Sequence, residues 1–426
     1  MFKTILKILF AIVILGALSF GVFWYLDRGQ GGSGVPSIGN ISIGDLFPFG
    51  NSGDTGTTPT PNTGTPNTTP DTTPTDDQTF APAPRLWRIS SDAQSGAGTF
   101  VSSSTPFVRF VDRATGNIFE SELGNTGTQR ISNTTIPKVY SALWLPNGNS
   151  VVMRYLDENN RTIKTTLGTI ASSTRVISTP GGDSPLATVR ELLTSFLPNN
   201  ITDISVNKAG SMVFVVKNQN TAQIFVANST GANPRNVFES AIKDRSVKWV
   251  DNTTLALGTK PSASAAGSLY FLKTDSLALT RVVGNKAGLV ALPNNGGTKI
   301  FYAESANGTF TSSIIDPKTG VETKPAFNTT PDKCVWASQT AYIYCAVPRS
   351  IPTGAYPDVW YQGKVSFTDD LWRHDTSSGA TEFLIDPDML IENGLDATDL
   401  VLDPTENYIV FTNKKDQSLW GLRIAK

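Results

Sequence analysis

Histidine and cysteine are almost absent from the sequence. Its 426 residues include one histidine and two cysteines. Because imidazole and thiolate groups are the common ligands of zinc and other transition metals, a multi-histidine metal centre is excluded. The sequence contains no nucleophile elbow, and its paired glycines at 181–182 and 296–297 are typical of turns rather than of a phosphate-binding loop. No cofactor is therefore expected.

Charge is also sparse. Charged residues make up 17% of the chain, the formal net charge is -1 and the pI is about 6.0. No strongly basic surface is available, so nucleic acid is not an expected partner. The single histidine, His374, would have to serve any Ser-His-Asp mechanism, and a structural role is expected for it. Carboxylates such as Glu304, Asp369 and Asp370 are the remaining catalytic material.

The longest hydrophobic run lies at the N-terminus. Residues 8–26 are apolar and uncharged, which is about the length that spans a bilayer as a helix. Lys3 and Lys7 precede the run, so the N-terminus is expected in the cytoplasm and the rest of the chain outside it. We assign residues 1–28 as a transmembrane signal-anchor of a single-pass membrane protein. A cleaved signal peptide, with its site near residues 17–19, is the alternative.

Residues 29–84 contain few apolar side chains. Glycine dominates the start of this segment, and threonine, proline, asparagine and aspartate dominate residues 54–77. Such a composition cannot bury enough apolar surface to fold, so a disordered linker is predicted. The folded part of the protein is then expected at residues 85–426.

A short hairpin recurs through residues 85–426. Residues 143–153, 204–215 and 400–411 each read as an apolar strand, a tight polar turn and a second apolar strand. Seven units can be counted, most of them about 40 to 45 residues apart, the length of a four-stranded blade. The sequence therefore predicts an all-β, seven-bladed β-propeller, with six or eight blades as alternatives. The innermost strands are expected to begin near Thr99, Val139, Ile201, Ser246, Gly288, Lys333 and Thr398.

The seventh unit lacks its outer strand. The chain ends after three strands of this unit, so the fourth must come from elsewhere. Residues 86–89, at the start of the domain, are apolar and suit this position. We expect them to close the ring, which removes an open sheet edge.

The hairpin turns also resemble those of a known family. Leu145-Pro146-Asn147-Gly148 and residues 403–407, each followed by an apolar strand, look like the WD-repeat-like blades of TolB-type propellers. The Gly-His and Trp-Asp landmarks of true WD repeats are missing. The resemblance implies architecture only, because this family includes both binding scaffolds and accessory domains of enzymes.

Strand direction assigns the long loops to faces of the disc. Loops between the second and third strands of a blade, and between successive blades, must emerge on one face. Residues 180–200, 260–267, 348–369 and 386–397 are all expected there, opposite the linker. In the first of these, Ser184 and Pro185 predict a helix start, and an apolar stripe follows from Leu186 to Leu197. Binding sites concentrate on long loops held by a rigid scaffold.

The insertion at 348–369 carries the candidate contact site. Aromatic side chains with acidic neighbours suit a protein or glycan contact. The candidate partner-binding residues are Tyr356, Asp358, Trp360, Tyr361 and Phe367. The alternative is that these aromatic rings fold the insertion onto the disc.

Two cysteines flank a predicted hairpin. With the turn centred on Gln339 and Thr340, Cys334 lies opposite Cys345 on the adjacent strand. Opposed Cβ atoms lie within reach of a disulfide, and an exported domain permits oxidation. A cross-strand disulfide is predicted, with two packed free thiols as the alternative.

Two functions compete. The first is a membrane-tethered, extracytoplasmic propeller that acts as an interaction scaffold for a protein or cell-envelope component. The second is a surface hydrolase or lyase that acts on glycan or peptide through carboxylates in the central channel. Three or more convergent Asp, Glu or Arg side chains around a pocket in the channel would favour the enzyme. A channel lined by small and hydroxyl side chains would favour the scaffold.

Overall fold

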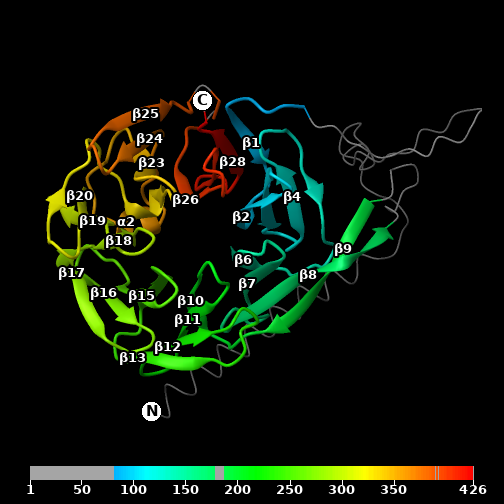
Figure 1. The fold of residues 1–426 in the computed structure, drawn as a ribbon, viewed down its shortest axis with the longest axis horizontal. Helices are drawn as coiled ribbons and strands as arrows, with labels where there is room; N and C mark the ends of the chain where they lie inside the picture. The colour runs from blue at the N-terminus through cyan, green and yellow to red at the C-terminus, as the bar shows by residue number, and fades with distance from the viewer. Residues whose placement is uncertain (1–80, 178–186, 389, 392, 426) are drawn as a thin grey trace, which may run out of the picture. The chain divides into compact units, whose positions relative to one another are not determined.

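The folded body is a ring of seven four-stranded antiparallel sheets, as predicted. The structure is a computed structural model, and it describes residues 81–177, 187–388, 390–391 and 393–425. The sheets are arranged around a central axis, with the first strand of each complete blade innermost (Figure 1). No helix among the described residues is long and apolar enough to cross a membrane. The predicted anchor and most of the predicted linker lie outside those residues.

Six blades are built from consecutive strands. Blade 1 contains β2 (Gln94–Ser102), β3 (Thr105–Asp112), β4 (Ile118–Glu122) and β5 (Gln129–Arg130). Blade 2 contains β6 (Val139–Trp144), β7 (Ser150–Leu156), β8 (Ile163–Ile177) and β9 (Ala187–Phe196). Blade 3 contains β10 (Ile201–Val206), β11 (Met212–Lys217), β12 (Ala222–Ala227) and β13 (Arg235–Ser240). Blade 4 contains β14 (Arg245–Trp249), β15 (Thr254–Thr259), β16 (Ala266–Lys273) and β17 (Leu279–Ala287).

The remaining blades carry two short helical segments within the described part of the chain. Blade 5 contains β18 (Val290–Pro293), β19 (Ile300–Ala306), β20 (Thr309–Ile315) and β21 (Glu322–Thr323). Blade 6 follows the 3-10 turn η2 (Pro331–Lys333) and contains β22 (Cys334–Trp336), β23 (Tyr342–Pro348), the helix α2 (Asp358–Tyr361), β24 (Asp369–Asp375) and β25 (Thr381–Ile385). Blade 7 contains β26 (Ala397–Leu402), β27 (Tyr408–Asn413), β28 (Leu419–Arg423) and, from the start of the domain, β1 (Leu86–Ser90).

An Asp or Asn side chain organises the recurring hairpin turn. In blade 7 the buried Asp403 Oδ1 accepts backbone hydrogen bonds from Asn407, at 2.8 Å, and Tyr408, at 2.7 Å. Such side chains mimic a backbone acceptor and so favour tight turns. The same arrangement recurs at the first turn of other blades, where the acceptors are Asn147, Asn207, Asp251 and Asn294.

The hydrophobic core is divided among the spaces between blades. On β11, Met212 and Phe214 pack in a cluster with residues of blade 2, whereas Val213 and Val215 pack with residues of blade 4. Because successive side chains of a strand point to opposite faces, the second strand of a blade is buried on both sides. This explains why the second strand of each hairpin is a continuous apolar run in the sequence.

The ring is closed by the expected segment. β1 pairs antiparallel with β28, so that Leu86 lies opposite Leu422 and Trp87 opposite Gly421. In Figure 1 the blue β1 lies beside the red β28. Trp87 is 4% exposed, and it packs in a cluster that also contains Val108 of blade 1. The closing strand therefore joins the last blade to the first.

The helix predicted after Ser184 is wrong where the structure describes it. Residues 187–196 form β9, which pairs with β8, and residues 178–186 lie outside the description. Val189 and Leu192 are buried, but Leu193 and Phe196 are 56% and 77% exposed, so no single apolar stripe is buried. The backbone N–H and C=O groups along the outer edge of β8 need hydrogen-bond partners, which β9 supplies. This requirement outweighs the helical spacing of the apolar residues.

This strand also removes one of the expected long loops. Because β9 is the outer strand of blade 2, blade 2 is joined to blade 3 by residues 197–200 alone, and not by a connection over residues 180–200. The connections at 260–265, 349–368 and 386–396 remain together on one face, which we call the elaborated face.

The closing strand should contribute strongly to stability. Replacement of Leu86, which is 2% exposed, by alanine should lower the free energy of unfolding by about 3 kcal/mol because it leaves a cavity between blades. Replacement of the 56% exposed Leu193 by alanine is the matched control and should change it by less than about 0.5 kcal/mol. Urea unfolding followed by tryptophan fluorescence measures both. If both variants lost the same free energy of unfolding, the packing of Leu86 in the closing strand would contribute no more than an exposed side chain.

Candidate functional site

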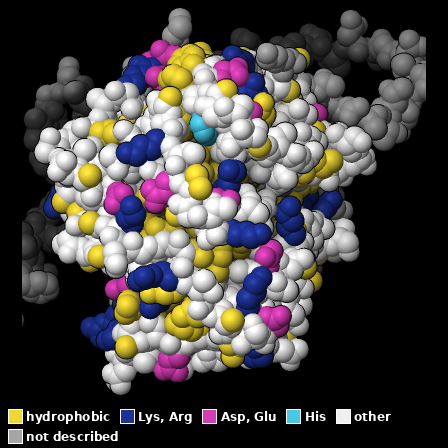
Figure 2. Space-filling view, turned by 60° about the vertical axis from the view of Figure 1, so that its left-hand side comes forward, with side chains coloured by type: hydrophobic (Ala, Val, Ile, Leu, Met, Phe, Trp, Pro, Cys, Tyr) yellow, Lys and Arg dark blue, Asp and Glu magenta, His cyan; other side chains and the backbone are white. Residues whose placement is uncertain are grey.

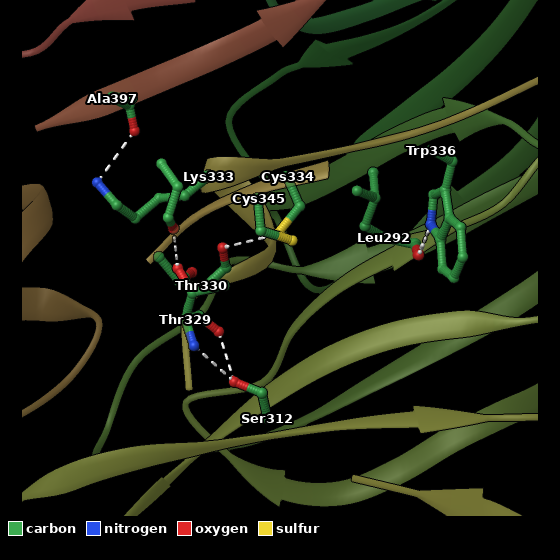
Figure 3. Close-up of a disulfide and its surroundings, with 10 residues drawn as sticks. Leu292, Ser312, Thr329, Thr330, Lys333, Cys334, Trp336, Cys345 and Ala397 are labelled. Carbon is green, nitrogen blue, oxygen red and sulfur yellow. Dashed lines mark hydrogen bonds between the residues drawn. A yellow bond between two sulfur atoms is a disulfide. The ribbon is translucent and has the colours of Figure 1, made fainter. Parts of the chain in front are cut away.

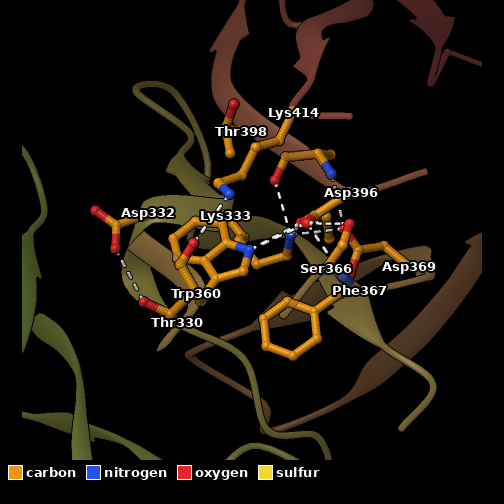
Figure 4. Close-up of polar contacts among 12 residues, drawn as sticks. Thr330, Asp332, Lys333, Trp360, Ser366, Phe367, Asp369, Asp396, Thr398 and Lys414 are labelled. Atoms are coloured by element: carbon orange, nitrogen blue, oxygen red, sulfur yellow. Dashed lines mark hydrogen bonds and ion pairs between the residues drawn. The ribbon is translucent and has the colours of Figure 1, made fainter. Parts of the chain in front are cut away.

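A buried lysine lies beneath the elaborated face. Lys333 ends η2 and is fully buried. Its Nζ lies 2.7 Å from Asp369 Oδ2 and 2.5 Å from Asp396 Oδ1, and it donates a hydrogen bond of 3.0 Å to the carbonyl of Ala397. Figure 4 shows the ammonium group between the two carboxylates, and Figure 3 shows its contact with Ala397. A buried charge requires such partners, because desolvation is otherwise very costly.

The same cluster holds the blade 6 insertion in place. Trp360 Nε1 donates to both carboxylate oxygens of Asp396, at 3.2 and 3.1 Å. Ser366 Oγ and the backbone amide of Phe367 donate to Asp396 Oδ2 at 3.0 and 3.1 Å. Lys333 Nζ lies 5.0 Å from the centroid of the Trp360 ring, within the range of a cation-π contact. The insertion is thus fastened to blades 6 and 7 at once.

The charges of the cluster are unequal. Two carboxylates share one ammonium, and the pKa values of the two carboxyls move in opposite directions. Burial raises the pKa of Asp369 to about 6, although Lys333 opposes the shift. Burial also acts on Asp396, but Lys333 and several hydrogen bonds outweigh it and lower its pKa. The cluster is fully enclosed, so it can position the insertion but cannot contact a substrate.

The predicted contact residues divide into two groups. Tyr356, Trp360 and Phe367 are each 2% exposed, and their rings pack together, with the Tyr356 and Phe367 centroids 6.0 Å apart. These three side chains are buried in one cluster with Phe310 of blade 5, so they pack the insertion against the disc. Tyr361 is 40% exposed, and Asp358 is half-buried and accepts a 2.6 Å hydrogen bond from the amide of Ala263. Tyr361 and Asp358 remain available as candidate contact residues.

The two cysteines form a disulfide. Cys334 and Cys345 lie opposite each other on β22 and β23, in the expected register, and their sulfur atoms are 2.12 Å apart. Figure 3 shows this bond beside Lys333. The bond immediately follows η2, so it helps to fix the backbone that presents both Asp332 and Lys333.

The central channel opens on the elaborated face as a cavity of about 680 Å³. Its wall contains the beginnings of β2, β6 and β26 and the end of β27, together with Tyr361 of the insertion. Among the residues that line it, Asp332 and Asp399 are the only carboxylates and Lys248 and Lys414 the only cations. Most others are small or hydroxyl residues. Sequence reasoning missed all four charged residues, although each lies on or next to an inner strand or a loop of this face.

The two channel carboxylates differ in their surroundings. Asp332 Oδ2 accepts hydrogen bonds from the Tyr361 hydroxyl, at 2.7 Å, and from Thr330 Oγ1, at 3.1 Å. Asp399 has a positive φ of 52° at an irregularity of β26, and its exposed side chain lies within the channel. Enclosure by the surrounding blades raises the pKa of Asp399, and the negative charge of Asp332 raises it further. Burial and Asp332 likewise raise the pKa of the Tyr361 phenol.

The other candidate catalytic and metal-binding side chains are not brought together among the described residues. His374 is 4% exposed, its Nδ1 is 2.8 Å from Thr381 Oγ1, and burial lowers its pKa, so its surroundings are those of a structural residue. Among the described residues no three His, Cys, Asp or Glu side chains are grouped to hold a metal ion. On the face shown in Figure 2, acidic and basic side chains are interspersed rather than gathered by sign.

Comparisons with known proteins show the fold. No family model matches the chain, and no curated protein matches its sequence. The β-propeller domain of the Trilobed protease from Pyrococcus furiosus, described as having an open velcro topology, has a TM-score of 0.50 and 9% identity, covering 78% of this chain and 96% of that domain. At this identity the likeness establishes architecture alone.

Two further solved structures are similar over most of this chain. The tricorn protease has a TM-score of 0.49 and 10% identity, covering 80% of this chain but only 34% of its own. TolB from Acinetobacter baumannii has a TM-score of 0.41 and 9% identity, covering 76% of this chain and 64% of its own. This chain therefore spans about a third of the length of the tricorn protease chain.

The pKa of Asp369 predicts how stability depends on pH. A carboxyl whose pKa is about 6 when folded and about 4 when unfolded binds more protons in the folded state. The free energy of unfolding should therefore fall as the pH rises from about 4 to about 6, by about 3 kcal/mol in total. In Asp369→Asn this part of the pH dependence should disappear. Urea unfolding at several pH values measures it, and an unchanged slope in the variant would contradict the assignment.

Proposed function

We propose that this protein is a membrane-tethered interaction scaffold whose elaborated face binds a protein of the cell envelope. The observation that carries the proposal is the way this face is built. Three long connections emerge on this face, and the largest, which lines the channel cavity with Trp360 and Tyr361, is fixed to two blades by the enclosed contacts of Lys333 and Asp396. A rigid surface loses little conformational entropy on binding, which favours recognition of a partner.

The lining of the channel favours a scaffold over an enzyme. The cavity has two carboxylates and no arginine among the described residues that line it, fewer than the three convergent side chains set out as favouring an enzyme. The rest of the wall is mixed: serine, threonine, alanine and glutamine lie beside aromatic and aliphatic side chains and two lysines. The accessible part of the insertion, Tyr361 above all, offers an aromatic contact of the kind that is frequent in protein interfaces.

Site-specific crosslinking tests the binding face. A photo-crosslinking amino acid in place of Lys260, on the elaborated face, should capture a discrete partner in intact cells. The same amino acid in place of Lys208, on the first turn of blade 3, is the control and should capture none. Both lysines are exposed in the structure, so access is matched. Equal capture from both positions, or capture from Lys208 only, would contradict the assignment of the face.

Fractionation tests the tether. The full chain is expected in the membrane fraction, resistant to alkaline washing, because residues 8–26 provide a membrane-spanning length of apolar sequence. A variant that lacks residues 1–28 and carries a cleavable export signal should instead be soluble. The folded body of the full chain should be degraded by protease added outside the cytoplasmic membrane. Release of the full chain by alkali, or protection of the body from that protease, would contradict tethering outside the cytoplasm.

A further inference from the structure

Lys333 and its two carboxylate partners are sealed from water. The side chains of Lys333, Asp369 and Asp396 are all 0% exposed, and Nζ lies 2.7 Å from one carboxylate oxygen and 2.5 Å from the other. The rings of Trp360 and Phe367 lie beside the ammonium group, with centroids 5.0 and 5.3 Å from Nζ (Figure 4). An amine held against a carboxyl in such a place is positioned to react with it, because the two groups meet within one molecule and bulk water is excluded.

The carboxyl of Asp369 has the surroundings of a reactive acid rather than of a simple ion-pair partner. Its Oδ2 accepts a 2.7 Å hydrogen bond from the backbone amide of Ala397. Its Oδ1 is buried and accepts no hydrogen bond from any described residue. An oxygen without a donor favours the neutral acid, and burial raises the pKa of Asp369 to about 6 despite the nearby lysine. The hydroxyl of a neutral acid can leave as water, and the departure of Oδ1 would break no hydrogen bond.

The carboxylate of Asp396 has the opposite surroundings. Its oxygens accept hydrogen bonds from four donors, which are the ammonium of Lys333, Trp360 Nε1, Ser366 Oγ and the backbone amide of Phe367. Burial opposes the ionisation of Asp396, but Lys333 and the hydrogen bonds outweigh it and lower its pKa. Asp396 is therefore the carboxylate that can take a proton from the ammonium and so free a nucleophilic amine.

We propose that Lys333 and Asp369 become joined by an intramolecular isopeptide bond. Asp396 accepts a proton from the ammonium, and the free amine attacks Cγ of Asp369 to form the C–N bond. The Ala397 amide then stabilises the negative charge that develops on Oδ2. Oδ1, which carries the acid proton, receives a second proton from Asp396 and leaves as water, while Asp396 takes a further proton from the nitrogen. The products are one amide and one water molecule, and no oxidant or cofactor is consumed.

The bond would fasten the elaborated face covalently. It would close a loop that contains β22, β23 and the insertion at 349–368, and the disulfide lies within this loop. The insertion would then stay attached at both ends even when the disulfide is reduced. Formation of the bond also removes the titration of Asp369, so the pH dependence of unfolding predicted for this residue applies to chains in which the bond has not formed. The inference does not rest on the proposed function.

Peptide mapping of the full chain by mass spectrometry tests the bond. The chain is reduced, alkylated and digested with trypsin, which does not cleave after a lysine whose side chain is an amide. We expect a branched peptide that joins residues 319–349 to residues 365–373 and is lighter than the two together by the mass of one water molecule. Fragmentation should place the branch at Lys333 and Asp369. Complete cleavage after Lys333, with no branched peptide, would overturn the proposal.

An exposed pair in the same digest is the internal control. Lys217 Nζ lies 2.8 Å from Asp244 Oδ1, a similar contact, but these side chains are 38% and 58% exposed. Water reaches this pair, and no second carboxylate is paired with its lysine, so no branched peptide is expected there. Equal amounts of the two branched peptides would mean that handling causes the bond, and would overturn the proposal.

Two variants test the role of Asp396. Asp396→Asn keeps an acceptor for Trp360 but cannot take the proton, so the branched peptide should form about a hundredfold more slowly after pulse labelling. Ser366→Ala is the matched control, because it removes one hydrogen bond to Asp396 and leaves the carboxylate, and its rate should change less than about threefold. An unchanged rate in Asp396→Asn, or an equal loss in both variants, would overturn the assigned chemistry. The map of the unaltered chain decides whether the bond exists even if a variant does not fold.

Discussion

The pairing of β1 with β28 is the constraint on which the rest of the structure depends. Each blade buries its apolar side chains against its two neighbours, so the first and last blades bury theirs fully only when they also pack against each other. Trp87 shows how closely the closing contact fits. A Cβ atom at Gly421 would lie 2.5 Å from the Trp87 ring, so only glycine allows this approach. Closure brings the last blade beside the first and so completes the wall of the channel, to which β2 and β26 both contribute.

Within the closed ring, the Lys333 cluster determines the shape of the elaborated face. An apolar contact of equal size could have held the insertion at least as stably, since replacing buried ion pairs by hydrophobic side chains is often neutral or stabilising. The ionic arrangement is more selective about geometry. Asp396 accepts from Lys333, Trp360, Ser366 and the amide of Phe367, and these donors converge in one position of the insertion. The rim of the cavity is thereby fixed with respect to Asp332.

The architecture could be predicted from the sequence because the same local hairpin pattern recurs along the chain. The Asp and Asn turns and the apolar second strands indicated seven blades, and the missing last strand identified residues 86–89 as the closure. The helix predicted after Ser184 failed although the apolar residues there have helical spacing, because pairing with the edge of β8 decided the local structure. Aromatic residues of the insertion could not be divided into buried and exposed, because Trp360 and Tyr361 are adjacent and only the position of Asp396 determines which ring turns inward.

The charged residues of the channel could not be identified from the sequence, for a different reason. Innermost strands face the central channel rather than another blade, so their exposed positions carry no hydrophobic pattern, and a functional aspartate resembles any polar residue. Asp399 shows the consequence. It is exposed, yet the blades around it exclude enough water to raise its pKa, and Asp332, from a different blade, adds to the effect. An enclosed but accessible charge interacts with a ligand more strongly than a charge on an open surface. Ring closure thus gives two ordinary carboxylates an environment that neither has in the unfolded chain.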